Sequence, residues 1–475
     1  MTTEALDAIS MKLGAGVAEQ ERPLLSRAFL ETPESSKLVN DLSDTIVGGR
    51  GHGKSALYEY LLQESEGTGI LAADGLGPEL TVGNTLSEFF RTPTAATLPS
   101  QRWLAFIVGR CAEELLAEME TYELGDTAEL EDGLDDIRSL FTTGTADQSL
   151  LQAIFRAVQL NAIDESALGA QLETVSNELL LEVIELLSDH DRKMYLLFDK
   201  LDEVFISSVN AEIDAVRSLQ SAANRVNSIA IDQNSGLRIK LFIRSDIEKL
   251  SARKYQGVFQ RSPHEELRLT WNKERVSQVI WHRLVTTDFL NELPAGARSK
   301  LAEQSQKSAK LDLVFGADTS GIAEADIFAP NGSIWTWVLS ATRDATGIYN
   351  PRFILKVIGG AIESCRSEDS QPWGPSGLPL VTPKSVYQAW VKTSEFALNE
   401  RATSYSQVRD VQRMLKVNRS TEAPEFRQQL GEAMNIAPSD VSDYIDALHL
   451  SGVFAESGGR FSIGAIFWPA FGARL

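Results

Sequence analysis

One stretch decides the fold of this chain: Asp44-Thr-Ile-Val-Gly-Gly-Arg-Gly-His-Gly-Lys-Ser-Ala56. It opens with the apolar pair Ile46 and Val47, and a helix-prone run follows at residues 56–62. Strand, glycine-rich loop and helix form the context in which the pattern G-x-x-x-x-G-K-S folds as a phosphate-binding P-loop. The alternative, a glycine-rich turn with a surface lysine, does not account for the apolar pair before the loop and the helix-prone run after it. We therefore predict a nucleoside triphosphate site.

The residue types of the loop suit phosphate binding. Glycine permits backbone torsions that residues with a Cβ resist, so successive N–H groups can converge on phosphate oxygens. The positive end of the following helix adds to this field. Lys54 is expected to reach the β- and γ-phosphates and to assist catalysis, and the Ser55 hydroxyl to complete a Mg²⁺ shell. The predicted nucleotide-binding residues are Gly48, Gly49, Arg50, Gly51, His52, Gly53, Lys54, Ser55 and Ala56.

Length and composition narrow the class of protein. A chain of 475 residues is too long for one compact domain, and its 43% hydrophobic residues can bury real cores. The formal charge of -21 disfavours nucleic acid and anionic membranes unless a local basic patch overrides it. Cys111 and Cys365 form no metal or redox motif, which favours a reducing compartment. Since we find no signal peptide and no run of ~20 apolar residues, we predict a cytoplasmic protein without a membrane partner.

Buried strands alternate with helices along the first part of the chain. The continuous apolar run 194–198 is typical of a central parallel strand, and we predict further strands at 237–244 and 266–271. A further strand is possible within 65–95. This alternation predicts an α/β fold, a P-loop NTPase core with a three-layer parallel sheet.

The remaining segments are mainly helical. Residues 101–185 are helical and acidic. This block could offer a docking face for a basic partner or a metal site, but a solvated helix face explains it better because its acids do not have the spacing of metal ligands. A loop at 365–382, rich in Ser, Gly and Pro, is typical of a domain boundary. We divide the chain into an N-terminal segment with the first part of the ATPase core (1–100), an acidic helical insertion (101–185), the rest of the core (186–271), a helical lid (272–370), and a helical linker with a winged-helix domain (380–475).

The catalytic candidates surround the end of the strand at 194–198. Asp199 follows it directly, and a carboxylate there would hold Mg²⁺, usually through water, opposite Ser55. This is the Walker B role, and the alternative is an acid that merely caps the strand end. Lys200 occupies the next position, and with an ordinary pKa of ~10.4 it cannot act as a base. Asp202 and Glu203 are the remaining carboxylates that could activate water, with Glu203 slightly preferred because its side chain is longer. Either could instead be structural, and turnover could be slow.

Two arginines could sense the nucleotide. Arg244 and Asp246 lie at the end of the strand expected beside the strand that precedes Asp199. A polar group there could contact the γ-phosphate. Arg352 begins a helix of the lid and could neutralise charge during phosphoryl transfer. For both arginines the alternative is a local surface ion pair. A basic cluster that could supply an arginine finger, or form only a solvated loop, comprises Lys249, Arg253, Lys254 and Arg261.

These motifs resemble a known family. Phe198-Asp-Lys-Leu-Asp-Glu203, Phe242-Ile-Arg-Ser-Asp246, Leu269-Thr-Trp271 and Asn350-Pro-Arg352, in this order, are similar to a bacterial P-loop ATPase family of the FunZ type, itself similar in plan to AAA+ origin-recognition and STAND ATPases. The resemblance implies an ATPase core, a helical lid with a sensor arginine and a C-terminal winged helix. It also implies an ATP-driven switch, in several cases in phage-defence or mobile-element settings. Lys200 departs from the Asp-Glu pair of origin-recognition ATPases.

The C-terminal residues carry a winged-helix pattern with an unusual charge. Helices are predicted at 425–434 and 439–449, followed by two strands around a Gly-Gly turn within 452–462. A DNA-reading helix offers Arg, Lys, Asn or Gln to the duplex, whereas the second helix offers carboxylates, which a phosphate backbone repels. We therefore expect protein contact here rather than nucleic-acid binding, unless the wing with Arg460 binds alone. The acidic residues are Asp440, Asp443 and Asp446.

The favoured hypothesis is a cytoplasmic, Mg²⁺-dependent ATPase switch. ATP binding would close the lid over the core of a homo-oligomer and so control a protein effector partner, in a setting such as bacterial anti-phage defence. The alternative is an AAA+ DNA-binding initiator or loader that acts through the winged helix, and a third hypothesis is a nucleotide-binding scaffold with negligible hydrolysis. ATP is preferred over GTP because no guanine-reading motif is apparent.

Overall fold

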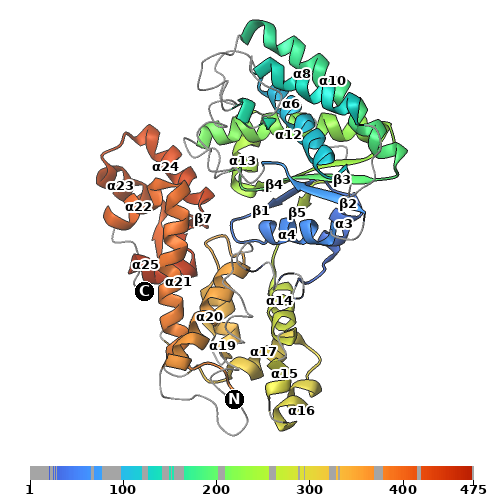
Figure 1. Ribbon diagram of the computed structural model, residues 1–475. Coiled ribbons are helices and arrows are strands. Elements are labelled where there is room, and N and C mark those ends of the chain that lie inside the picture. Colours follow the sequence, from blue (N-terminus) through green and yellow to red (C-terminus); the bar gives the residue numbers. More distant parts are fainter. Residues whose placement is uncertain are drawn as a thin grey trace. The chain divides into compact units, whose positions relative to one another are not determined.

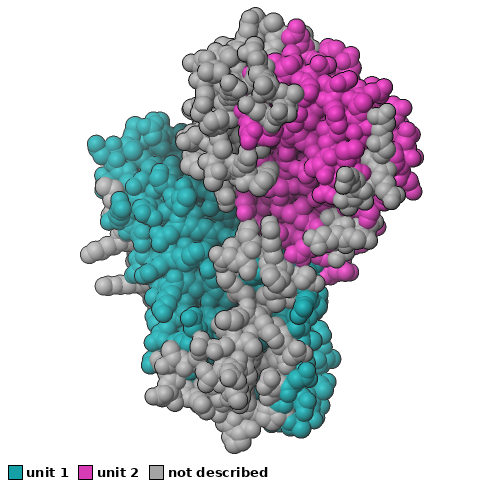
Figure 2. Space-filling model, viewed as in Figure 1, with its two compact units in different colours: residues 1–30, 50–53, 270–475 teal, residues 31–49, 54–269 magenta. Residues whose placement is uncertain are grey.

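The computed structural model forms two compact units, which are described separately. Unit 1 comprises residues 1–30, 50–53 and 270–475, and unit 2 comprises residues 31–49 and 54–269 (Figure 2). The structure describes residues 21, 25, 27, 29–65, 69–76, 98–119, 127–141, 149–150, 152–154, 165–201, 209–255, 264–286, 289–293, 295–319, 322, 328–329, 332–367, 378–414 and 419–472.

Unit 2 is built on a five-stranded sheet in the order β2-β3-β4-β1-β5. All of its pairings are parallel, which confirms the predicted α/β fold (Figure 1). The strand predicted within 65–95 is present as β2. The strands are β1 (Thr45–Gly48), β2 (Ile70–Asp74), β3 (Lys193–Phe198), β4 (Gly236–Arg244) and β5 (Leu267–Arg268).

Helices cover both faces of this sheet, because the central strands carry apolar side chains on both sides (Figure 1). Met194, Leu196 and Phe198 of β3 face helices α6 (Leu98–Ala117), α10 (Glu165–Asp189) and α12 (Val209–Asp232), with which they share one hydrophobic core. On the opposite face, the ring of Tyr58 in α4 (Lys54–Ser65) lies edge-on against Phe242, with 5.8 Å between ring centroids.

The acidic helical block of the sequence consists of α6, α8 (Ala128–Phe141) and α10. Its buried residues do not form a core of their own: Trp103 of α6 meets Phe198 of β3 edge-on, at 6.1 Å between ring centroids. The leucines of α8 and α10 belong to the same cluster as the strands. Helices α6 and α10 are therefore part of the layer that covers the sheet.

A buried lysine joins the sheet to the N-terminal helix α3 (Pro33–Val39). Lys240 of β4 has a fully buried side chain, and its ammonium donates to the Leu38 carbonyl at 3.0 Å and to Asp41 Oδ1 at 2.9 Å. Burial lowers the pKa of Lys240, while its two carboxylate neighbours oppose that shift. Asp44, just before β1, lies 3.8 Å from the same ammonium and accepts a hydrogen bond from His264. Burial raises the pKa of Asp44, against the pull of these two partners.

Unit 1 contains helices and a small antiparallel sheet in the order β6-β8-β7. Asn272 and Thr382 cap two of the helices by accepting hydrogen bonds from the backbone N–H groups of Arg275 and Ser385. The helices are α14 (Lys273–Val285), α15 (Phe289–Glu292), α16 (Ala295–Glu303), α17 (Lys307–Phe315), α19 (Ile334–Ala341), α20 (Pro351–Ser367), α21 (Pro383–Ser404), α22 (Ser406–Met414), α23 (Ala423–Met434), α24 (Pro438–Leu450) and α25 (Trp468–Phe471), and the strands are β6 (Ser420–Glu422), β7 (Phe454–Ser457) and β8 (Arg460–Ile463).

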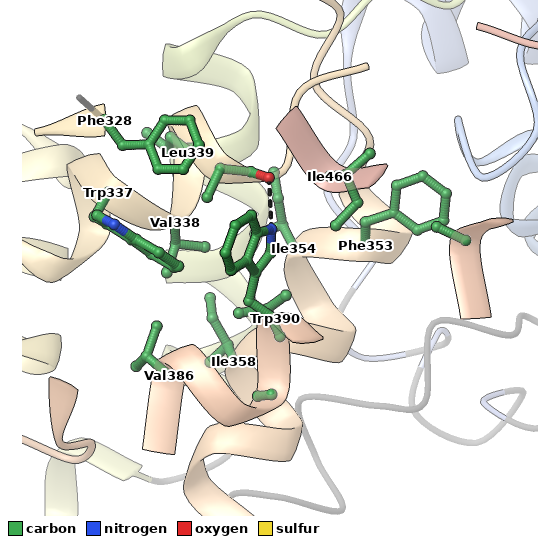
Figure 3. Close-up of a cluster of buried hydrophobic side chains, with 14 of the residues drawn as sticks. Phe328, Trp337, Val338, Leu339, Phe353, Ile354, Ile358, Val386, Trp390 and Ile466 are labelled. Carbon is green, nitrogen blue, oxygen red and sulfur yellow. Dashed lines mark hydrogen bonds between the residues drawn. The ribbon is translucent and has the colours of Figure 1, made fainter. Parts of the chain in front are cut away.

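An aromatic cluster holds unit 1 together (Figure 3). Trp390 of α21 meets Trp337 of α19 edge-on at 5.3 Å and Phe328 at 5.8 Å, and its indole N–H donates to the Ala341 carbonyl at 2.9 Å. Phe328 also stacks on Trp468, with 4.8 Å between ring centroids. The helices before and after residues 368–377 thus contribute to a single core.

The C-terminal elements lie where the sequence predicts them. Helices α23 and α24 are followed by the hairpin of β7 and β8, whose turn residues Gly458 and Gly459 have φ angles of 58° and 75°. The backbone N–H of Ala345 donates to the Gly452 carbonyl at 3.0 Å, so the hairpin is tied to the chain that follows α19. Within the part of the chain that the structure describes, no helix is long and apolar enough to span a lipid bilayer.

Lys240 and Lys193 offer a matched test of burial, because both pair with Asp41. Lys193 is about half exposed and lies 3.3 Å from Asp41 Oδ2. Lys240→Met should lower the free energy of unfolding by about 3–5 kcal/mol, since it removes the buried cation that lies between the carboxylates of Asp41 and Asp44. Lys193→Met should cost less than about 1 kcal/mol. If urea unfolding showed the same loss of unfolding free energy for both variants, the buried ion pair would not be an anchor of α3.

Candidate nucleotide-binding site

The predicted strand, loop and helix are confirmed. Strand β1 ends at Gly48, helix α4 begins at Lys54, and the residues between them form the loop. Gly51 and Gly53 have φ angles of +75° and +90°, which side chains with a Cβ rarely adopt. The loop therefore alternates between left-handed and ordinary torsions, as a cradle of converging N–H groups requires.

The four residues at the tip of the loop, 50–53, belong to unit 1 by their contacts. Trp271 donates its indole N–H to the His52 carbonyl at 2.9 Å, and Asn350 donates its amide N–H to the Arg50 carbonyl at 2.7 Å. Around Gly51 there is no space for a side chain: an added Cβ would lie 2.4 Å from Asn350 Oδ1. At Gly53 the nearest atom would be 3.7 Å away.

The P-loop lysine is buried beside the loop it belongs to. Lys54 donates from Nζ to the carbonyls of Gly48 at 3.0 Å and Gly49 at 3.2 Å. An ammonium forms a stronger, charge-assisted hydrogen bond with an anion than with a carbonyl oxygen. The geometry therefore fits an ammonium that turns toward phosphate oxygens.

Ser55 and Asp199 lie together although they are far apart in the sequence. The Ser55 hydroxyl donates to Asp199 Oδ2 at 2.6 Å. Asp199 follows β3, Ser55 lies in the first turn of α4, and β4 separates β3 from β1 in the sheet. The carboxyl ends of these parallel strands share one edge, with Gly48 opposite Arg244. The predicted pair of Mg²⁺ ligands is thus brought together at that edge.

The two oxygens fit a small, hard cation. Adjacent ligands of octahedral Mg²⁺, at 2.0–2.1 Å from the ion, lie about 2.9 Å apart, so Ser55 and Asp199 would need to separate by only about 0.3 Å. Across the described residues, no cluster of three or more His, Cys, Asp or Glu side chains could hold a metal by itself. Two protein oxygens with phosphate and water as the other ligands are the usual Mg²⁺ arrangement.

The chain turns sharply after Asp199. Lys200 has a φ of +56°, an uncommon value for a residue with a side chain. Such conformations persist where the surrounding structure imposes them and cluster at functional sites. The two candidate bases that follow, Asp202 and Glu203, lie outside the described residues.

Arg244 is engaged in a local ion-pair cluster at the end of β4. Its guanidinium donates to both carboxylate oxygens of Asp246, with Nε 3.1 Å from Oδ1, and lies 3.8 Å from Glu212. The strand does lie beside β3, as predicted. Of the basic cluster after this strand, Lys254 pairs with Asp214 at 2.6 Å, and Arg261 lies outside the described residues.

Arg352 lies in unit 1, in the first turn of α20. Its guanidinium pairs with Glu400 of α21 at 3.0 Å, and its backbone N–H donates to Asn350 Oδ1 at 3.1 Å. Arg50, at the tip of the loop, reaches the same helix and donates to the Ser404 hydroxyl at 2.5 Å. The sequence gives no sign of Glu400 or Ser404 as partners, because only the packing of α20 on α21 brings them near.

An acidic residue that the sequence analysis did not select ends β2. Asp74 pairs in register with Leu197, two positions before Asp199, and accepts a hydrogen bond from Tyr58 of α4. Burial raises the pKa of the Tyr58 phenol, and Asp74 and Asp199 raise it further. The sequence could have indicated Asp74, because this acid comes directly after a short apolar run, as Asp199 does.

The chain has partial similarity to a transposon protein and to a solved ATPase. No model of a known protein family matches the chain. A protein of Escherichia coli strain K12, described as an 80.3 kDa protein of transposon gamma-delta, is 25% identical over 280 residues, or 55% of this chain. The match spans only 38% of that protein. A solved Walker-type ATPase of Pyrococcus abyssi aligns over 93% of this chain and 95% of its own, at 13% identity and a TM-score of 0.43.

The glycines of the loop should respond differently to alanine. Gly53→Ala should lower the free energy of unfolding by about 1 kcal/mol, the cost of a left-handed torsion. Gly51→Ala should cost about 2–3 kcal/mol, because its methyl group also overlaps Asn350. Gly296→Ala, in helix α16 with no atom within 4 Å of the new methyl group, should be neutral or stabilising. Urea unfolding measures the free energy of all three variants. If Gly51→Ala lost no more free energy of unfolding than Gly53→Ala, the overlap of its methyl group with Asn350 would be refuted.

Proposed function

We propose that this protein binds ATP with Mg²⁺ and hydrolyses it. The observation that carries the proposal is the hydrogen bond from Ser55 to Asp199, at the mouth of a glycine-rich loop with the sequence of a P-loop. A serine hydroxyl and a strand-end carboxylate, placed together at a helix N-terminus, are the two protein ligands that P-loop NTPases give to Mg²⁺. ATP remains the preferred nucleotide, since no guanine-reading motif is present in the sequence.

Each residue of the site has a distinct task in this proposal. The backbone N–H groups of the loop and of the first turn of α4 would bind the phosphate oxygens, and Lys54 would add its charge to the β- and γ-phosphates. Ser55 and Asp199 would hold Mg²⁺. When bound, Mg²⁺ neutralises charge on the β- and γ-phosphate oxygens. Ala56, the next residue of α4, adds its backbone to the same helix terminus.

Hydrolysis also requires a group that orients the attacking water. Asp202 and Glu203 follow Asp199 closely enough to serve, and we prefer Glu203 for its longer side chain. Arg244 and Arg352 are proposed as sensors of the γ-phosphate. Because each of them pairs with carboxylates, a sensor role would require it to exchange that partner for phosphate. We therefore propose slow basal turnover that a conformational change accelerates.

The biological role we propose is an ATP-driven switch. The FunZ-type resemblance, with its AAA+ and STAND-like plan, favours a homo-oligomer in which residues 272–370 act as the lid and residues 380–475 form a helical linker and a winged helix. Such a switch would control a protein effector, in a setting of anti-phage defence or mobile elements. The similarity to a transposon protein is in keeping with the second setting. A cytoplasmic location is part of the proposal.

DNA binding is the alternative, and the charges of the C-terminal region weigh against it. Helix α24 exposes the three carboxylates of Asp440, Asp443 and Asp446, which a phosphate backbone would repel. Arg460 of the hairpin is paired with Glu422 and donates to Ser420 at 2.9 Å. An initiator or loader would need a basic surface elsewhere.

The first test of the proposal removes the P-loop lysine. Lys54→Ala should weaken the binding of a fluorescent ATP analogue roughly 10- to 100-fold, the loss expected when a charge-assisted bond disappears. ATP hydrolysis should fall to background. Lys37→Ala is the control, because this exposed lysine only pairs with Glu265 on the surface. Unchanged nucleotide binding by the Lys54 variant would overturn the proposal.

A second test separates the metal ligand from the phosphate cradle. Ser55→Ala should weaken ATP binding about tenfold or more in Mg²⁺, whereas in EDTA the variant and the native protein should bind equally. The control is Ser439→Ala, which removes a similar Ser–Asp hydrogen bond from the surface, to Asp440 at 2.9 Å. If Ser55→Ala weakened binding as much in EDTA as in Mg²⁺, the hydroxyl would not act through the metal.

A further inference from the structure

Two donors on unit 1 hold the backbone of the P-loop tip. Trp271 Nε1 donates to the carbonyl of His52 at 2.9 Å, and Asn350 Nδ2 donates to the carbonyl of Arg50 at 2.7 Å. From this geometry we propose that Trp271 and Asn350 are positioning residues, which fix the loop amides in the orientation that binds phosphate. The inference rests on the proposed function, because it assigns the two residues to the same nucleotide site.

The consequence for the amides follows from peptide geometry. In a trans peptide the C=O of one residue and the N–H of the next point in opposite directions. When Asn350 and Trp271 fix the carbonyls of Arg50 and His52, they also fix the N–H groups of Gly51 and Gly53, which point away from the two donors. Both N–H groups are thus presented to an acceptor on the other side of the loop.

The two donors are themselves rigid. Asn350 is almost completely buried, and its Oδ1 accepts a hydrogen bond from the backbone N–H of Arg352, which leaves only Nδ2 to meet the Arg50 carbonyl. Its own carbonyl accepts from Ile354 in the first turn of α20. The ring of Trp271 packs against the hydrophobic core of unit 1. Neither side chain can turn away without disturbing its surroundings.

The loop is shaped to accept these contacts. Gly51 lies against the Asn350 amide so closely that a methyl group would overlap it, with Arg352 Cβ only 3.0 Å away. Arg50 adds a third attachment, through its guanidinium to Ser404 and, at 3.4 Å, to the Glu400 carbonyl of α21. A left-handed glycine between two anchored carbonyls can be held in one conformation, whereas an unanchored one would sample many.

The experiment compares two tryptophans that make the same bond in different places. Trp271→Phe keeps an aromatic ring but removes the N–H donor to the loop together with the second ring of the indole, a loss of volume that the Trp468 control shares. Trp468→Phe is the matched control: Trp468 is also partly buried in unit 1 and donates to the Ile463 carbonyl at 2.9 Å. The full-length proteins are titrated with a fluorescent ATP analogue and a fluorescent ADP analogue. The melting temperature without nucleotide and the hydrogen exchange of residues 50–53 are measured on the same samples.

We expect Trp271→Phe to bind both nucleotides about three- to tenfold more weakly than the native protein, the effect of one net hydrogen bond. Amide exchange at residues 50–53 should be faster in this variant. Trp468→Phe should keep native affinity and native exchange in the loop. The two variants should melt at similar temperatures, so that a general loss of stability cannot explain the difference.

A double-mutant cycle tests Asn350 in the same way. Asn350→Ala should weaken binding of both nucleotides by a similar factor. It should also reduce the additional loss of affinity caused by Gly51→Ala, because the overlapping amide is gone, but leave the loss caused by Gly53→Ala unchanged.

The outcomes separate the two proposals. If the native protein binds neither nucleotide, the proposed function is wrong and the positioning role falls with it. If the native protein binds and Trp271→Phe binds equally well with unaltered loop exchange, the positioning role is wrong and the proposed function stands. Equal weakening by Trp271→Phe and Trp468→Phe would also overturn the inference, since it would indicate a structural effect only.

Discussion

The hydrogen bond between Ser55 and Asp199 is the constraint on which the proposed chemistry depends. It joins a helix residue to a strand end across 144 positions of the sequence. Two packing arrangements must be correct for it to form. Strand β4 must insert between β1 and β3, and α4 must dock on the sheet through contacts such as that of Tyr58 with Phe242. The two oxygens therefore come together only when β1, β3, β4 and α4 have packed against one another.

Three cations named as site candidates already have hydrogen-bond or ion-pair partners within the chain. Arg244 pairs with Asp246, Arg352 pairs with Glu400, and Lys54 is held by carbonyls of its own loop. A cation that already has a partner gains less from a new anion than one that is solvated alone, because the first interaction must be given up. In the proposed function, a nucleotide would have to displace these partners before the three cations could bind it.

The sequence predicted the core of this fold for a clear physical reason. Central parallel strands are buried on both faces, so β3 appears as a nearly continuous apolar run, and the loop after β1 has a distinctive pattern. Strand β4 is also rich in apolar residues, although Arg238 and Lys240 interrupt them. Strand β2, rich in alanine, gave a weaker signal. Lys240 shows the limit of such patterns, because a lysine inside a buried strand is acceptable only with Asp41 nearby.

The contacts of the site could be predicted only in part. Ser55 and Asp199 were identified because both belong to motifs with known positions at the edge of a sheet. Trp271 and Asn350 stood in motifs that suggested a family but no contact, and their acceptors lie 219 and 300 residues away. Glu400 and Asp74 lie near the site only through helix packing and strand register, which no local pattern records.

The path of the chain limits how this protein can be dissected. It passes between the two units at residues 30–31, 49–50, 53–54 and 269–270, and two of these passages flank the tip of the P-loop. A gene fragment that stopped at residue 269 would encode every strand of the large sheet, yet its loop would lack the indole and the amide that hold it. In that fragment, residues 50–53 would be separated from the unit to which their contacts assign them.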